Sequence, residues 1–201
     1  LKVGRVIARP FLGSKVNNFY RTKNRKDYTF PPPNKTLCDL VVENNRSCHA
    51  IGKIADIFSN RGISTSVSGL SDDALFYKMI DVIKKAKNGD LIFANFVEFD
   101  SLYGHRRDVA GFAAALERFD LKLVKLLEII NPNDFLIITA DHGNDPTFKG
   151  TDHTREKVPV LMVGNYAQKG NNGNIVFSDV GATMASFLHL SGKLKGTNIF
   201  K

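Results

Sequence analysis

Cysteine is scarce in this chain of 201 residues: only Cys38 and Cys48 occur, and they form no Cys-x-x-Cys pair. Their number and spacing argue against both a disulfide framework and a thiolate metal site. Long apolar runs are also missing, since none approaches the ~18 residues that a membrane span requires. We therefore expect a protein of the reducing cytoplasm that has no membrane partner.

Acidic residues are fewer than basic ones, with 20 Asp and Glu against 28 Lys and Arg, so the formal net charge is +8. A basic surface can attract anions, including nucleic acid. However, the basic residues are spread along the chain, and no nucleic-acid-binding motif occurs. We therefore expect no nucleic-acid partner. Binding of the phosphate groups of a small substrate is the simpler explanation for some of these basic residues.

The chain is long enough for one good core, or for a core with a small accessory piece. Residues 1–34 are basic and end near Pro31-Pro32-Pro33, which predicts an irregular segment and a boundary. A regular pattern begins at Lys35, so we divide the chain into residues 1–34 and 35–201. Because the chain opens on Leu1 with a strand-like segment, we expect it to be the C-terminal part of a longer protein.

Helix and strand patterns alternate along the second part of the chain. Apolar residues at helical spacing follow the capping residues Thr36 and Ser71. The predicted helices cover residues 36–44, 54–60 (helix or turn), 71–83, 109–130 and 178–190, and the predicted strands cover residues 49–52, 91–99, 135–140 and 158–163. Such alternation predicts an α/β fold with a largely parallel sheet that helices cover on both faces.

Two of the predicted strands end in residues that bind metals. The run 135–140 leads into Asp141 and His142, and the run 91–99 leads into Asp100, with His105 shortly after it. His153 follows in a loop rich in Gly, Thr and Asp. In open α/β sheets the carboxyl edge of the strands is where ligands bind. This mixture of carboxylate and imidazole groups predicts a site for a pair of divalent ions of the Mn or Zn kind.

The grouping of these residues carries more weight than any one of them. A single histidine near a strand end is usually structural, and a single aspartate there is usually a helix cap. Adjacent residues on a strand point to opposite faces. Asp141 and His142 can therefore converge only if the chain turns, and Gly143 and Asn144 supply that turn. The other two histidines of the chain, His49 and His189, are predicted to be structural.

Three segments carry a resemblance to a known family. They are residues 100–108, which end in Gly-His-Arg-Arg-Asp, residues 139–146, which begin Thr-Ala-Asp-His-Gly-Asn, and residues 150–156, Gly-Thr-Asp-His-Thr-Arg-Glu. They resemble the phosphopentomutases of the alkaline-phosphatase-like metalloenzyme superfamily, as do residues 4–11 and 51–56. Cofactor-independent phosphoglycerate mutases share the Thr-Ala-Asp-His-Gly-Asn core, whereas the other two segments favour phosphopentomutase.

The resemblance implies an alkaline-phosphatase-like α/β core, incomplete at its N-terminus, with residues 1–34 as the remnant of a cap domain. It implies two manganese ions. One would be held by Asp100, His105 and His153, and the other by Asp141 and His142 together with an aspartate outside this chain. The implied reaction interconverts ribose (or deoxyribose) 1-phosphate and 5-phosphate through a phosphothreonine. That threonine also lies outside this chain, so we expect the chain alone to be inactive.

Two sets of basic residues are candidates for supporting roles. Arg9, Arg21 and Lys53 are predicted to bind substrate phosphate, because guanidinium and ammonium groups suit it. Solvated surface charge is an equal alternative for each of them. The basic residues beside the candidate ligands are predicted to orient those ligands instead of touching substrate; they are Arg106, Arg107 and Arg155.

Two other functions stay open at this point. One is a non-catalytic fragment that binds metal or sugar phosphate and needs a partner chain, for which the missing nucleophile is the support. The other is a different phosphoryl-transfer enzyme of the same superfamily, such as a cofactor-independent phosphoglycerate mutase. A panel of substrates separates the enzymes from each other. An upstream segment that carries the threonine and the aspartate would favour an enzyme over a fragment.

Overall fold

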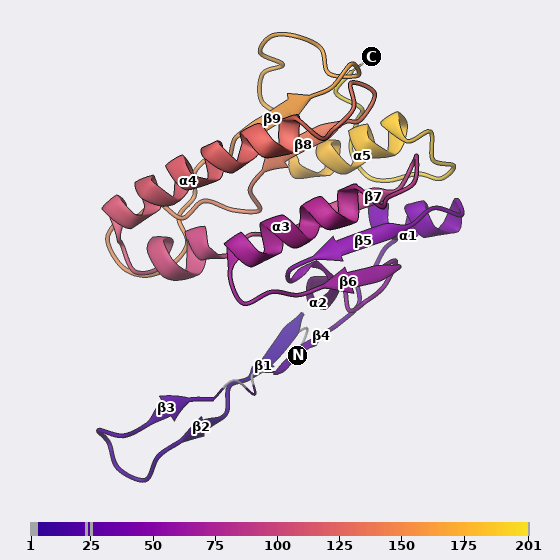
Figure 1. Ribbon diagram of the computed structural model, residues 1–201. Helices are drawn as coiled ribbons and strands as arrows, with labels where there is room; N and C mark the ends of the chain where they lie inside the picture. Colours follow the sequence, from indigo (N-terminus) through magenta and orange to yellow (C-terminus); the bar gives the residue numbers. More distant parts are fainter. Residues whose placement is uncertain (1–3, 23, 25, 201) are drawn as a thin grey trace.

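An α/β body carries a narrow hairpin that projects from one side of it (Figure 1). The structure is a computed structural model. It describes residues 4–22, 24 and 26–200, without the side chains of Arg21 and Asp27. None of the helices in these ranges is long and apolar enough to cross a bilayer.

The body is built on a parallel sheet of three strands. Strand β5 (Cys48–Ile51) lies in the middle, between β6 (Thr65–Val67) and β7 (Leu91–Ala94). Side chains of β5 alternate between the two faces, as they do in any strand. Cys48 and Ala50 pack toward α1 and α2, whereas Ile51 packs in the cluster around α3. The predicted α/β class with a parallel sheet between helices is confirmed.

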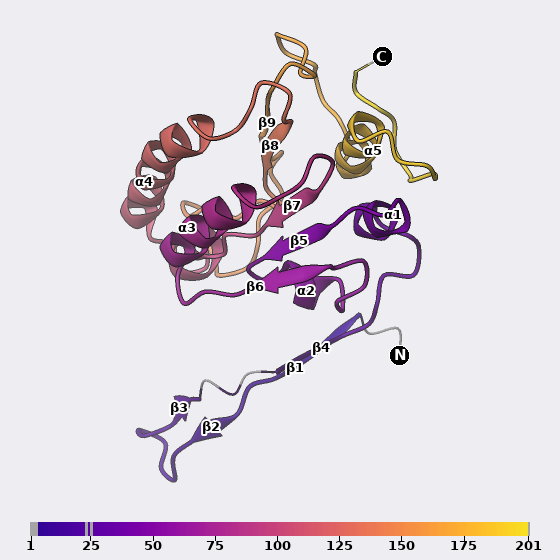
Figure 2. The ribbon, with the colours of Figure 1, turned by 45° about the vertical axis from the view of Figure 1, so that its right-hand side comes forward.

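Helices cover both faces of this sheet. Helices α1 (Leu37–Glu43) and α2 (Ile54–Ile57) contact β5 from one side, and α3 (Asp72–Ile83) lies on the other (Figure 2). Helix α4 (Val109–Leu127) lies beside α3, and α5 (Phe177–Phe187) packs against α1. The predicted caps are confirmed, because the side chains of Thr36 and Ser71 accept backbone hydrogen bonds at the starts of α1 and α3.

The last two strands form a separate sheet. Strand β8 (Leu136–Thr139) pairs with β9 (Val160–Val163), and the pair is antiparallel. Residues 158–163 were predicted as a strand of a largely parallel sheet; the strand is present, but its pairing with β8 is antiparallel. A parallel connection needs a crossover, usually a helix, that returns the chain to its starting edge. Residues 140–159 contain no helix. They form the loops that carry Asp141, His142 and His153.

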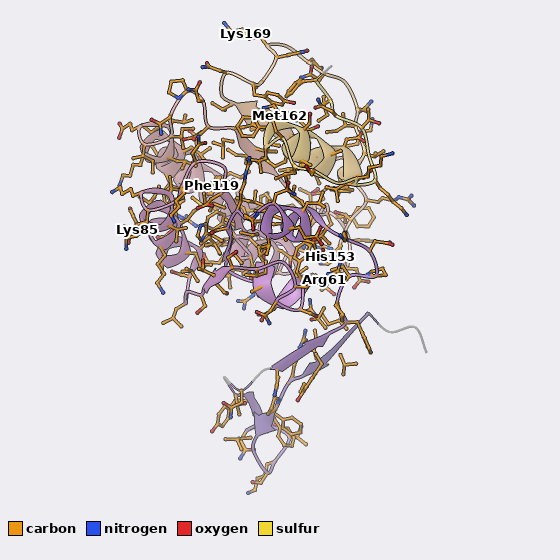
Figure 3. The ribbon with its side chains drawn as sticks, turned by 90° about the vertical axis from the view of Figure 1, so that its right-hand side faces the viewer. Arg61, Lys85, Phe119, His153, Met162 and Lys169 are labelled. Carbon is orange, nitrogen blue, oxygen red and sulfur yellow. The ribbon has the colours of Figure 1, made fainter. Side chains whose placement is uncertain are left out.

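Residues 4–30 are more regular than their composition predicts. Strand β1 (Arg5–Ala8) pairs with β4 (Lys26–Thr29), and β2 (Phe11–Leu12) pairs with β3 (Tyr20–Arg21) beyond them. The prediction of an irregular segment is wrong, because turn-forming residues occur mainly at the tip. There the Asn18 side chain accepts hydrogen bonds from the backbones of Ser14 and Lys15. Figure 3 shows the side chains of this hairpin standing out without a covering layer.

One arginine fixes the base of the hairpin to the body. The Arg61 guanidinium donates to the carbonyls of Pro32 (2.5 Å) and Asn34 (2.7 Å) and to both carboxylate oxygens of Asp39 (2.9 and 2.8 Å). Burial opposes ionisation of Asp39, but the hydrogen bonds from Arg61 and Thr36 outweigh it and hold the pKa of Asp39 below its ordinary value. The segment between hairpin and body is therefore held by charge-assisted hydrogen bonds.

Strand β7 ends earlier than predicted. It stops at Ala94, and the chain continues into a π-helix, η1 (Phe99–Gly104). The turn is caused by Asp72, whose carboxylate accepts hydrogen bonds from the backbone nitrogens of Val97 (3.0 Å) and Glu98 (2.9 Å). Burial raises the pKa of Asp72. As a result, Asp100 projects from a helical turn and not from a strand end. Strand β6 was not predicted, because it is short and mostly polar.

Candidate metal centre

Two loops at the end of the β8–β9 pair bring two histidines together. Asp141 and His142 follow β8, and Gly143 forms an isolated antiparallel bridge with Thr154, whose nitrogen donates to the Gly143 carbonyl at 3.1 Å. This bridge places His153 beside His142, and their rings stack with centroids 3.8 Å apart and planes at 21°. The predicted turn at Gly143 therefore brings a distant histidine to this edge.

Asp100 faces this pair from the π-helix. Its Oδ1 atom lies 3.3 Å from Nε2 of His153, and its Oδ2 atom lies 3.4 Å from Nε2 of His105. The rings of His105 and His153 also stack, with centroids 4.8 Å apart. The segment before α4, which carries Asp100 and His105, thus lies beside the segment after α4 that carries His153. The sequence predicts this proximity.

The tautomers of two histidines follow from their hydrogen bonds. Nδ1 of His105 lies 2.5 Å from the Thr151 carbonyl, and Nδ1 of His142 lies 3.2 Å from the Gly143 carbonyl. A carbonyl oxygen can only accept, so each Nδ1 carries a hydrogen, and in the neutral ring Nε2 then keeps its lone pair. Metal-binding histidines are oriented in this way. Both rings therefore present Nε2 as a ligand atom.

A divalent ion fits between three of these side chains. Among the residues that the structure describes, Asp100, His142 and His153 have ligand atoms that all lie within 4.8 Å of one another. Ligand atoms sit about 2.0–2.2 Å from such an ion, so two of them can be at most ~4.4 Å apart. Movements of a few tenths of an ångström would close the group. One carboxylate and two imidazoles suit an ion of the Mn or Zn kind.

Asp141 lies at the rim of this group. Its side chain is 70% exposed, and Oδ1 lies 3.7 Å from Nε2 of His142. Neither Asp141 nor His105 belongs to the tight group, whereas His142 does. The predicted division into one site of Asp100, His105 and His153 and another of Asp141 and His142 stays a prediction.

Of the three arginines predicted to orient ligands, Arg107 has the contacts for that role. Its guanidinium donates to carbonyls of three segments, those of Gly104 (3.1 Å), Asp145 (2.8 Å) and Asp152 (2.6 Å), and also to the Gly150 carbonyl. The side chains of Arg106 and Arg155 are exposed, and neither has a hydrogen bond or ion pair with another residue of the described ranges.

Two of the predicted phosphate-binding residues, Arg9 and Arg21, lie on the hairpin, and Lys53 lies on the body. Arg9 is exposed on the hairpin, where it lines a shallow hollow with Phe11, Phe19 and Tyr20. Lys53 is half-buried at the start of α2. The side chain of Arg21 lies outside the described part of the chain. The assignment of these three residues to phosphate binding stays a prediction.

Sequence reasoning missed Asn144 and Glu156. The Asn144 side chain donates to Oδ1 of Asp100 at 2.7 Å, although its place in a turn suggested only a backbone role. Glu156 accepts from the Thr154 hydroxyl at 2.5 Å, and that hydroxyl accepts from the nitrogen of Asp145 at 2.6 Å. The unbroken polar run Thr154-Arg155-Glu156-Lys157 was the available signal for Glu156.

The comparison with known families decides the membership of this chain. A model described as the metalloenzyme superfamily matches residues 41–192, which include all five candidate ligands. The chain belongs to the metalloenzyme superfamily. Together with the cluster of Asp100, His142 and His153, this membership indicates a metal site.

Relatives within the metalloenzyme superfamily are closely similar over nearly the whole chain. The phosphopentomutase of Legionella pneumophila is 51% identical over 194 residues, which are 96% of this chain and 47% of the relative. Those of Allorhizobium ampelinum (49% identical, 94% of this chain, 47% of the relative) and Sinorhizobium medicae (52%, 92% and 46%) are similar. The predicted resemblance is confirmed, and the chain spans about half the length of these curated relatives.

A solved structure supports the fold of this chain. A protein from Pyrococcus horikoshii superposes with a TM-score of 0.63 over 87% of this chain and 58% of its own length. Because the sequences are only 15% identical, this likeness bears on the fold alone.

Proposed function

We propose that this chain is the metal-binding part of a phosphopentomutase that interconverts ribose (or deoxyribose) 1-phosphate and 5-phosphate in the cytoplasm. The observation that carries the proposal is the identity of about half of all residues with phosphopentomutases along 92–96% of the chain. The cluster of Asp100, His142 and His153 at one edge of the fold supports it.

The chemistry of phosphoryl transfer explains why such a cluster is needed. Charge on the moving group must be neutralised, and the attacking and leaving oxygens must be held in line. Two manganese ions, when bound, would supply that neutralisation. We propose that Asp100, His105 and His153 hold one of them, and that Asp141 and His142 hold the other with an aspartate from outside this chain. The chain's own part is to present imidazole Nε2 atoms and carboxylates in fixed orientations.

The nucleophile is proposed to be a threonine in a further half of the protein, supplied by the same polypeptide or by a partner chain. The length of the relatives, about twice the matched span, supports this half. The split of the sheet supports it too, since β7 and β8 each have one unpaired edge among the described strands. Open apolar edges are a liability that proteins normally cover. We propose that the further half covers them.

The hairpin is proposed to be the tail of a cap domain, as residues 1–34 were predicted to be. Its exposed apolar side chains, among them Phe11, Phe19 and Tyr20, support this assignment, because a two-stranded sheet cannot bury them by itself. Arg9 in their midst would bind the substrate phosphate, with Arg21 and Lys53 as the other candidates.

The experiment is complementation. The chain is assayed with Mn²⁺ for conversion of ribose 1-phosphate to 5-phosphate, alone and together with the unmatched half of the Legionella pneumophila phosphopentomutase. We expect no conversion by the chain alone, conversion by the mixture, and none with Asp141→Asn in the mixture. Conversion of phosphoglycerates in place of pentose phosphates would assign a different phosphoryl-transfer reaction. Metal binding without any turnover in the mixture would favour the non-catalytic fragment.

A further inference from the structure

Asn144 forms a bridge between two parts of the candidate metal centre. Its Nδ2 atom donates to Oδ1 of Asp100 at 2.7 Å, and its Oδ1 atom accepts from Nη1 of Arg107 at 2.7 Å. The orientation of this amide is fixed by its partners. An ionised carboxylate only accepts hydrogen bonds and a guanidinium only donates them, so the amide nitrogen must face Asp100 and the amide oxygen must face Arg107.

The π-helix leaves room for this bridge at one position. Gly104 is buried, and a Cβ atom added there would lie 2.5 Å from Nδ2 and 2.7 Å from Cγ of Asn144. Real Cβ atoms essentially never approach so closely. A side chain at position 104 would therefore push the Asn144 amide away from Asp100. The glycine is needed for space and not for its backbone conformation.

Arg107 holds the other end of the bridge. Its backbone adopts φ 55°, a left-handed conformation that costs energy for a residue with a long side chain. Its guanidinium donates hydrogen bonds to the Asn144 side chain and to the carbonyls of Gly104, Asp145 and Asp152. These contacts tie the π-helix to the two loops that carry His142 and His153. The oxygen of the Asn144 amide is thus held by a group that is itself fixed on several sides.

The effect falls on the Asp100 carboxylate. With Oδ1 held by Asn144, the two carboxylate oxygens face two different imidazoles, that of His153 at 3.3 Å and that of His105 at 3.4 Å. Rotation about the bond to the carboxylate would break the bond to Asn144. We propose that Asn144 is a positioning residue that fixes Asp100 for metal binding through the Arg107–Asn144–Asp100 relay. This inference rests on the proposed metal site.

The test is Mn²⁺ affinity, measured on the full chain by titration with detection of free Mn²⁺ by electron paramagnetic resonance. Removing a group that orients a ligand costs roughly 10- to 100-fold in metal affinity. We expect Asn144→Ala to weaken binding by this factor. The matched control is Asn133→Ala, since Asn133 is an exposed loop residue that accepts a hydrogen bond from Asn165 and precedes β8, whereas Asp141 and His142 follow that strand. Its affinity should equal that of the wild type.

A second variant makes the test independent of a general loss of structure. Gly104→Ala should weaken Mn²⁺ binding as Asn144→Ala does, because both break the same hydrogen bond. In the double variant the clash with Asn144 is gone, and the added Cβ atom meets the Phe99 carbonyl oxygen at 3.1 Å. The added Gly104→Ala change should therefore cost little further affinity. Additive losses, or wild-type affinity in Asn144→Ala, would overturn the relay while leaving the metal site in place. If the wild-type chain binds no Mn²⁺, the relay and the metal site both fail, whereas the complementation assay still decides the proposed reaction.

Discussion

The imidazole rings of His142 and His153 stack face to face, with centroids 3.8 Å apart and planes at 21°. One ring follows β8 and the other precedes β9, and the Gly143–Thr154 bridge holds their loops together. A Cβ atom at Gly143 would lie 2.8 Å from the Thr154 carbonyl oxygen and would also meet the Glu156 carboxylate. The close pairing of the two histidines therefore depends on a glycine between β8 and the bridge.

Loss of one ring of this pair should remove metal binding. We expect His153→Ala to weaken Mn²⁺ binding by at least about 100-fold, because His153 is one of three side chains in the tight ligand group. Calorimetric titration measures the change. The matched control is His189→Asn, since His189 lies beyond α5 with φ 50°, a conformation that asparagine tolerates. Equal losses in both variants would contradict a ligand role for His153.

The candidate ligands could be proposed from the sequence because each lies close in sequence to an apolar run, and such ends gather at the edge of a sheet. The direction of β9 could not be predicted in this way. Its sequence is that of any buried strand, and only the absence of a helix between residues 140 and 159 makes it antiparallel. The contact of Asn144 with Asp100 was equally hidden, since it spans 44 positions and depends on the space at Gly104.

Metal should also stabilise the fold, because the candidate ligands come from three separate segments, the π-helix η1 and the loops that carry His142 and His153. A ligand that binds only the native state raises the free energy of unfolding by about 2.7 kcal/mol at 100 times its dissociation constant. We expect Mn²⁺ to raise the Tm of the chain and a chelator to reverse the rise. Thermal unfolding followed by circular dichroism measures both. A rise of the same size in His153→Ala would mean that Mn²⁺ acts elsewhere.

The Asp39–Arg61 pair predicts a dependence of stability on pH. Because the folded-state pKa of Asp39 is lowered, the stabilisation is fully present above the unfolded-state value of about 3.9. It is lost as the pH falls through the lower, folded-state pKa. We expect the wild type to lose more unfolding free energy between about pH 5 and about pH 3 than Asp39→Asn does.

Urea unfolding at a series of pH values tests this prediction. The control is Asp120→Asn, which removes an exposed carboxylate from the middle of α4 and should leave the pH dependence of the wild type nearly unchanged. A pH dependence in Asp39→Asn as steep as that of the wild type would show that other carboxylates cause the acid sensitivity.

The hairpin shows a different limit of sequence reasoning. Composition describes the tip well, where Asn18 closes the turn, but the strands pair through backbone groups that any residue supplies. Basic side chains such as those of Arg5 and Lys26 are compatible with a two-stranded ribbon exposed on both faces. A basic composition therefore did not exclude a strand.

His49 should separate structural from metal-binding histidines. It lies near the amino ends of the strands, where Nδ1 is 2.7 Å from the Thr65 hydroxyl and Nε2 is 3.2 Å from Oδ2 of Asp90. The same carboxylate accepts from the nitrogens of Ser47 and Lys87. His49 thus joins β5 to β6 and to the start of β7, as its predicted structural role requires.

His49→Ala should therefore lower the free energy of unfolding by about 1–3 kcal/mol, because the buried Asp90 carboxylate loses a hydrogen bond. Its Mn²⁺ affinity should match that of the wild type, since the side chain bonds residues at the opposite ends of the strands from Asp100. Urea unfolding and calorimetric titration give the two numbers. His153→Ala is expected to show the reverse pattern, a large loss of affinity with a small loss of metal-free stability, since its ring is half-exposed at 49%. A loss of Mn²⁺ affinity in His49→Ala without a loss of unfolding free energy would mean that the metal centre extends along the sheet to His49. The ligand set proposed from the segments after β7 and β8 would then be wrong.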